Sequence, residues 1–261
     1  MAMLYSNRVA QLVGILNITP DSFSDGGQFV EPKKAVAQAV KLFQDGAILV
    51  DIGAESTRPG AVALDWHEEW ARLEPVLMEL EKQFPGWLSV DTHHPETVEK
   101  VLAIRNDIII NDVTGMNNPA MVRVVSNHNA RCIISHLIGA DIQAAHNGEL
   151  EDANIIRDDL YNRAQLLESK GVDHEHIILD PGIGFGKTPE LNRRLLTFPN
   201  LITDYPVMIG YSRKRFLGEH RMELESNLEA GRIAAQAGAA YLRVHDVAGH
   251  RSLLTTGSDI R

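Results

Sequence analysis

Short apolar runs and longer amphipathic stretches alternate along the whole chain, and this repeat limits the possible folds more than any other feature. The apolar runs are short and often β-branched, as in parallel strands covered on both faces; they are residues 13–16, 47–52, 87–90, 108–110, 132–134, 177–179, 206–209 and 240–244. Helices are predicted between them, over residues 32–44, 66–83, 95–103, 119–127, 152–170, 189–196 and 227–237.

Eight strand–helix units in 261 residues predict an α/β fold, a single (β/α)8 TIM barrel domain over residues 1–261. A doubly wound open sheet is the alternative, but such sheets usually carry a dinucleotide or phosphate fingerprint. Helix-entry residues support the element boundaries. Asn118 and Thr188 each precede a first-turn proline, and Ser226–Glu229 reads as a capping box.

Polar residues follow the predicted strands at their carboxyl ends, where TIM barrels place their active sites. These residues are Asn17, Asp51, Asp91, Asn111 with Asp112, Ser135 with His136, Asp180, Ser212 to Lys214, and Arg243 with His245. One such residue alone is usually structural. Together, however, they predict a polar rim that contains both acids and bases, and this rim is the expected active site.

The segment from Ile178 to Thr188 is the most unusual part of this rim. A buried strand ends at Asp180 and is followed by Gly182, Gly184 and Gly186, which allow sharp turns and close approach to a ligand. The spacing fits neither the phosphate-binding loop nor the dinucleotide fingerprint, so a nucleotide-binding protein is disfavoured. A buried carboxylate at the base of this loop needs a partner, from the protein or from a ligand.

Composition excludes several classes of function. The net charge of −10 argues against a general nucleic-acid or acidic-membrane surface. Cys132 is the only cysteine, so no internal disulfide can form and a reducing compartment is expected. We find neither a signal peptide nor an apolar run of about 18 residues, and we therefore expect a cytoplasmic protein without a membrane span.

Two long motifs, Gly14–Gly27 (GILNITPDSFSDGG) and Asp51–Gly60 (DIGAESTRPG), resemble the signatures of dihydropteroate synthases. Shorter segments resemble later family motifs in the same order; they are Ser89–Thr92, Ile110–Val113, Asp180–Lys187, Ser212–Lys214 and Arg243–Asp246. The resemblance implies a TIM-barrel transferase of folate biosynthesis. It would join p-aminobenzoate to 6-hydroxymethyl-7,8-dihydropterin diphosphate, require Mg²⁺, form a homodimer and be a sulfonamide target.

The resemblance also assigns roles to individual residues. The pterin diphosphate would be bound by Thr57, Asp91, Asn111, Asp180, Lys214, Arg243 and His245. A carboxylate suits the donor edge of a pterin, and cations suit a diphosphate. The p-aminobenzoate would lie against Phe23, Pro59, Phe185, Ser212 and Lys214, and Asn17 would supply an oxygen ligand to Mg²⁺.

The implied mechanism begins with departure of pyrophosphate, which leaves a cationic pterin. Asp25 would stabilise this cation, Arg58 would neutralise the leaving group, and Lys214 completes the expected catalytic set. The long loops 19–29 and 55–64 would close over the site and exclude water. The aromatic amine needs little activation, so no nucleophile–histidine–acid triad is expected.

The chain departs from the family pattern at several positions. Arg215 stands where the family usually has a serine beside p-aminobenzoate, and we expect altered sulfonamide sensitivity. Leu137 and Ile138 replace a Met-Gln pair; Leu137 can pack under the pterin, but Ile138 cannot replace an amide contact. The 218–226 segment and the helix after Val247 are short, which weakens the expectation of a dimer.

The sequence leaves three alternatives to the synthase. A non-catalytic pterin-binding paralogue is disfavoured because Asn17, Asp25 and Arg58 are all present, and a corrinoid-dependent methyltransferase domain would not need diphosphate contacts. The third is the nucleotide-binding protein discussed above. The histidines at 93–94 and 174–176 match no zinc motif and come without a cysteine cluster, so the sequence predicts no metal site there.

Overall fold

Eight parallel strands form one sheet that closes into a barrel. The computed structural model describes residues 9–19, 32–55, 62–84, 86–139, 145 and 149–255. The strands are hydrogen-bonded in the order β6-β5-β4-β3-β2-β1-β8-β7, and a parallel bridge between Leu179 and Val207 closes the ring. Their bounds are β1 Gln11–Asn17, β2 Leu49–Gly53, β3 Trp87–Asp91, β4 Ile109–Asp112, β5 Cys132–Ser135, β6 Ile177–Asp180, β7 Met208–Ile209 and β8 Tyr241–Val244. The predicted TIM barrel is confirmed.

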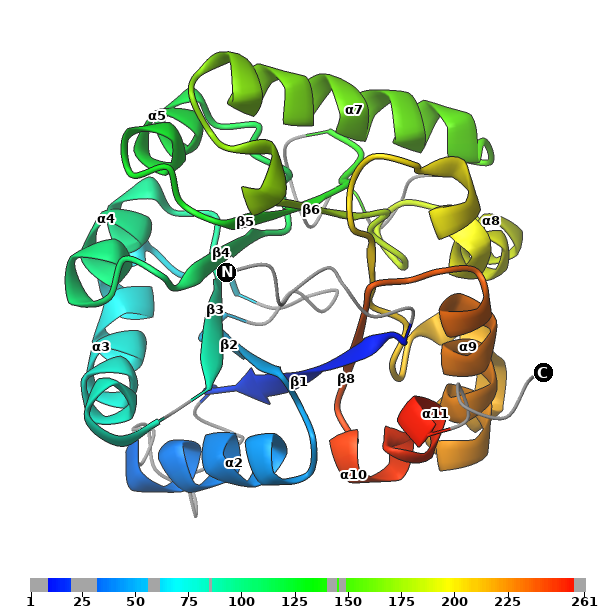
Figure 1. Ribbon diagram of the computed structural model, residues 1–261, viewed down its shortest axis with the longest axis horizontal. Coiled ribbons are helices and arrows are strands. Elements are labelled where there is room, and N and C mark those ends of the chain that lie inside the picture. The colour runs from blue at the N-terminus through cyan, green and yellow to red at the C-terminus, as the bar shows by residue number, and fades with distance from the viewer. Residues whose placement is uncertain are drawn as a thin grey trace.

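Helices surround the barrel as an outer ring (Figure 1). The α-helices are α2 Pro32–Gln44, α3 Trp66–Gln83, α4 Pro95–Ile104, α5 Pro119–Asn127, α7 Ala153–Ser169, α8 Pro189–Arg194, α9 Leu224–Gln236, α10 Val247–His250 and α11 Ser252–Thr255. Three 3-10 helices accompany them in the described ranges, η1 His174–His176, η2 Leu195–Leu201 and η3 Arg215–Met222. The main core lies between strands and helices, where outward residues such as Val50 and Ile52 belong to one cluster with Leu73 and Leu77 of α3.

The barrel interior has two layers because side chains on a strand alternate between its faces. The lower layer is an apolar cluster of Val13, Leu49, Ile109, Ile133, Ile178, Met208 and Tyr241. Two residues further along, most of these strands or their ends place a polar residue or a glycine on the same side; these are Asp51, Asn111, Ser135, Asp180, Gly210 and Arg243. The lower layer therefore fills the barrel beneath a polar upper layer.

Local capping chemistry fixes most helix starts where the sequence predicts them. The Asn118 side chain accepts from the Ala120 amide, and Thr188 accepts from that of Leu191. The predicted capping box at Ser226 is wrong, because α9 already begins at Leu224. The buried Asn227 donates to the Glu223 carbonyl at 2.7 Å and accepts from the Arg213 amide at 2.9 Å. These bonds tie the first turn of α9 to the preceding loop and start the helix earlier.

No helix within the described residues is long and apolar enough to cross a membrane.

Candidate active site

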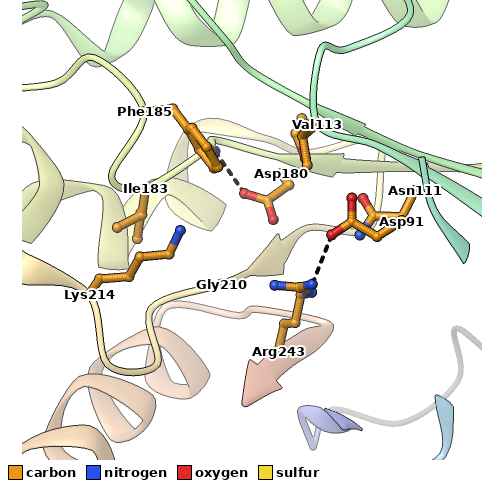
Figure 2. A pocket seen from close by; sticks show the side chains of 11 residues that line it. Asp91, Asn111, Val113, Asp180, Ile183, Phe185, Gly210, Lys214 and Arg243 are labelled. Carbon is orange, nitrogen blue, oxygen red and sulfur yellow. Dashed lines mark hydrogen bonds and ion pairs between the residues drawn. The ribbon is translucent and has the colours of Figure 1, made fainter. Parts of the chain in front are cut away.

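The carboxyl ends of the strands surround a cavity at the upper layer of the barrel (Figure 2). The residues that line it are Asp91, Asn111, Val113, Ser135, Asp180, Gly182, Ile183, Phe185, Gly210, Lys214 and Arg243. Strands β3, β4, β5, β6 and β8 contribute polar groups, and the segments that follow β4, β6 and β7 contribute the rest. The structure thus brings together residues that are far apart in the sequence, as the predicted polar rim requires.

Asp51 connects the polar groups of this cavity; the sequence placed it in the polar rim but gave it no role of its own. Its carboxylate accepts hydrogen bonds from Ser89 Oγ at 2.6 Å, Asn111 Nδ2 at 3.0 Å and Arg243 Nε at 2.6 Å. A second nitrogen of Arg243 bonds Asp91 at 3.0 Å (Figure 2). The signal was present in the sequence, since a carboxylate inside an apolar strand must find partners.

Asn111 and Asp180 present acceptors to the cavity. Asn111 donates to Asp51, and its buried Oδ1 has no hydrogen-bond partner among the described residues. One oxygen of Asp180 accepts from the Gly182 amide at 2.7 Å, and the other points across the pocket in Figure 2. Burial raises the pKa of the Asp180 carboxyl. Such a pair suits a ligand that carries several N–H donors on one edge.

The glycine-rich loop after β6 is held by a buried lysine. Lys187 Nζ donates to the carbonyls of His136, Gly182 and Phe185 at 3.1, 2.8 and 2.9 Å, and burial lowers its pKa to about 7. Gly182 has φ +65°, and a Cβ there would lie 2.0 Å from the His136 carbonyl oxygen. Only glycine fits this position, so loop and cavity wall are fixed together.

Lys214 lies across the cavity from Asp180. Its Nζ is 4.5 Å from the centroid of the Phe185 ring, which is a cation–π distance. Burial, followed by the nearby Arg243 charge, lowers the pKa of Lys214 to about 8. Beside it, Ser212 Oγ lies 3.0 Å from His245 Nδ1. Lys214, Ser212 and His245 form a second part of the site. It lies next to the group in which Arg243 bonds Asp51 and Asp91.

Other expected site residues are placed differently. Asn17 is the last residue of β1 and is half-buried at the same end of the barrel. Phe23, Asp25, Thr57, Arg58 and Pro59 lie outside the described residues.

Asp112 does not line the cavity. It accepts from the Thr114 and Met116 amides, at 2.8 Å each, and therefore shapes the turn after β4.

A family model described as "Pterin binding enzyme" matches residues 13–245. The dihydropteroate synthase of Neisseria meningitidis serogroup C is 37% identical over 255 residues, which cover 91% of this chain and 88% of the relative. The enzyme of Bacillus subtilis is 36% identical over 246 residues, which cover 90% of this chain and 83% of the relative. The chain belongs to the dihydropteroate synthase family.

A solved structure of this family agrees in fold. The Xanthomonas albilineans enzyme with 4-aminobenzoic acid has a TM-score of 0.85 and 37% identity, and the match covers 95% of this chain and 91% of that one. The same enzyme in complex with 7,8-dihydropteroate gives a TM-score of 0.82 and 34% identity. These relatives are transferases of folate biosynthesis, so the chain is placed among enzymes of that class.

The departures from the dihydropteroate synthase pattern can be located in the structure. Arg215 is exposed to solvent at the start of η3. Leu137 is buried in a cluster with Val113 and Phe185, both of which line the cavity. Ile138 lies against the loop after β6, where a Cβ on Gly186 would be 2.8 Å from Ile138 Cδ1.

Proposed function

We propose that this chain joins p-aminobenzoate to 6-hydroxymethyl-7,8-dihydropterin diphosphate, forming 7,8-dihydropteroate and pyrophosphate. The observation that carries the proposal is the pair of inward acceptors, Asn111 Oδ1 and the carboxylate of Asp180. A pterin ring offers amino and N–H donors along one edge, which match these acceptors. Asp91, Lys214 and Arg243 line the same cavity and complete the proposed pterin pocket with Thr57.

The bonding changes are a substitution at the methylene carbon of the pterin. The C–O bond breaks and pyrophosphate leaves with its electron pair, producing a cationic pterin that the Asp25 carboxylate would stabilise. The aromatic amine then forms the C–N bond and loses a proton to water. Arg58, Arg243 and His245 would bind the diphosphate and neutralise the charge that develops on it. In the structure Arg243 is held in place by Asp51 and Asp91.

Magnesium fits the donor available at the end of β1. The amide oxygen of Asn17 is a hard donor of the type that Mg²⁺ prefers, and the remaining ligands would be diphosphate oxygens and water. When bound, Mg²⁺ would supply positive charge against the leaving group. We assign Asn17 as its single protein ligand.

The p-aminobenzoate would bind against Phe185, Ser212 and Lys214, with Phe23 and Pro59 from the two long loops. An aromatic ring packs on Phe185, and the Lys214 ammonium suits the carboxylate of this substrate. Sulfonamides, which have the shape of p-aminobenzoate, would compete here. A dihydropteroate synthase of Yersinia pestis has been solved in a sulfonamide complex, which supports this part of the proposal.

The test is release of pyrophosphate by purified protein supplied with the pterin diphosphate, p-aminobenzoate and Mg²⁺. We expect release only when all three are present, loss of release in Asp25→Ala, and normal release in the surface control Asp107→Ala. Asp107 is exposed and pairs with Arg105. Pterin binding without release would instead identify a non-catalytic paralogue.

We further propose a cytoplasmic homodimer. The family resemblance supports the homodimer. The single cysteine, Cys132, which is fully buried, supports a reducing compartment such as the cytoplasm. Light scattering of the purified chain tests the oligomeric state, and cell fractionation tests the location.

A further inference from the structure

A glutamate and two histidines converge at the rim next to the cavity. Glu55 follows β2, and His93 and His94 follow β3. Each offers one metal-ligating atom, and these atoms all lie within 4.8 Å of one another. None of the three lines the cavity described above, so the cluster is not needed to explain pterin binding.

Two of these atoms are buried without a hydrogen-bond partner in the described part of the chain. They are Oε2 of Glu55 and Nε2 of His94. The two atoms are 4.0 Å apart, which is too long for a direct hydrogen bond. Buried polar atoms in proteins nearly always have a partner, so the gap between these atoms indicates a bound group that contacts both.

The backbone that carries the histidines is held in place. Thr92 Oγ1 accepts from the His94 amide at 3.1 Å and donates to the buried Glu69 carboxylate at 2.7 Å. His94 is the N-cap residue of α4, yet its side chain makes no capping hydrogen bond.

We propose that Glu55, His93 and His94 bind one divalent transition-metal ion of the Zn²⁺ class, at a site separate from that of Mg²⁺. Two imidazoles and one carboxylate select such ions, whereas Mg²⁺ prefers oxygen ligands. Tetrahedral bonds of about 2.0–2.2 Å put neighbouring ligand atoms roughly 3.4 Å apart. The 4.0 Å between Glu55 and His94 thus needs only a small side-chain shift. Water or a small anion would take the fourth position.

Cobalt(II) tests this site because its visible absorption reports the ligand geometry. Tag-free full-length protein is titrated with Co²⁺ in the presence of excess Mg²⁺, and Zn²⁺ is then added as a competitor. We expect one Co²⁺ per chain, an intense visible band typical of four-coordination, and loss of that band when Zn²⁺ is added.

Variants assign the ligands. Glu55→Gln and His94→Gln keep the shape of the side chain, and each is expected to weaken Co²⁺ binding on the order of 100-fold. His220→Gln is the matched control, because His220 also lies beside a glutamate, with Nδ1 2.8 Å from Glu223, but is exposed on η3. Circular dichroism confirms that each variant is folded.

Four results would overturn the proposal. Three are binding no tighter than about 1 mM, displacement of Co²⁺ by Mg²⁺, and equal affinity in wild type and both site variants. The fourth is a loss of affinity in His220→Gln comparable to that in His94→Gln, which would show that the ion binds to surface histidines instead.

Discussion

The two layers of the barrel interior are built on the same strands but do opposite things. In the lower layer, apolar side chains such as Ile133 and Ile178 pack against one another and are almost completely buried. In the upper layer, Asp180 and Asn111 are also buried, and the Oδ1 atom of Asn111 has no hydrogen-bond partner among the described residues. The same strand alternation therefore provides a filled core below and a prepared polar site above.

The difference shows where stability has been given up for function. Apolar burial in the lower layer contributes about 25 cal/mol per Å², whereas a buried carboxylate is costly. The raised pKa of Asp180 gives the sign of its effect on the free energy of unfolding. A carboxyl group that ionises less readily in the folded state destabilises the fold at pH values above its ordinary pKa. Ile178 and Asp180, two residues apart on β6, represent the two layers.

Asp180→Asn should have the largest effect on activity. It removes the charge but keeps an acceptor for the Gly182 amide, so only pterin recognition suffers. Loss of two charged hydrogen bonds costs about 3–6 kcal/mol, or roughly 10²–10⁴ in kcat/KM. The free energy of unfolding at pH 7 should stay equal or rise. Steady-state kinetics and urea denaturation measure both quantities, and a large loss of stability would contradict this account of the upper layer.

Ile178→Ala should give the opposite result. Truncating a buried isoleucine leaves a cavity in the lower layer and lowers the free energy of unfolding by about 2–5 kcal/mol. The rate constant kcat at a temperature where the variant is folded should stay close to that of the wild type. Ile155→Ala, at an exposed position on α7, is the control. A variant that lost activity without losing stability would show that the two layers are not separate.

The pH dependence of activity tests the upper layer through Lys214. With a pKa of about 8, this lysine is charged below pH 8 and neutral above it. Activity that needs the ammonium should fall about tenfold per pH unit above pH 8. In Lys214→Arg the charge persists, so the decline in kcat/KM should move to higher pH even if the maximum is lower. An unchanged basic limb in this variant would assign the titration to another group.

The sequence predicted the fold closely because strand and helix patterns are local. Each predicted strand overlaps an observed one, and the start of α3 at Trp66 was predicted correctly. The polar strand ends were also predicted, since the barrel itself brings them to one rim. The contacts between side chains across the barrel were not predicted, because they depend on the direction in which each side chain points. Asp51 bonding Arg243, and Glu55 beside His93, join residues that no sequence spacing connects.

Arg215→Ser is expected to have the smallest effect. The serine usual in this family would replace an exposed arginine at the start of η3, directly after Lys214. Exposed charges contribute about 0.2–1 kcal/mol, so the sulfonamide inhibition constant should change by no more than roughly fivefold. The KM for the pterin diphosphate should not change, because the acceptors on Asp180 and Asn111 are untouched. Equal sulfonamide inhibition of wild type and variant would contradict the expected change in sulfonamide sensitivity.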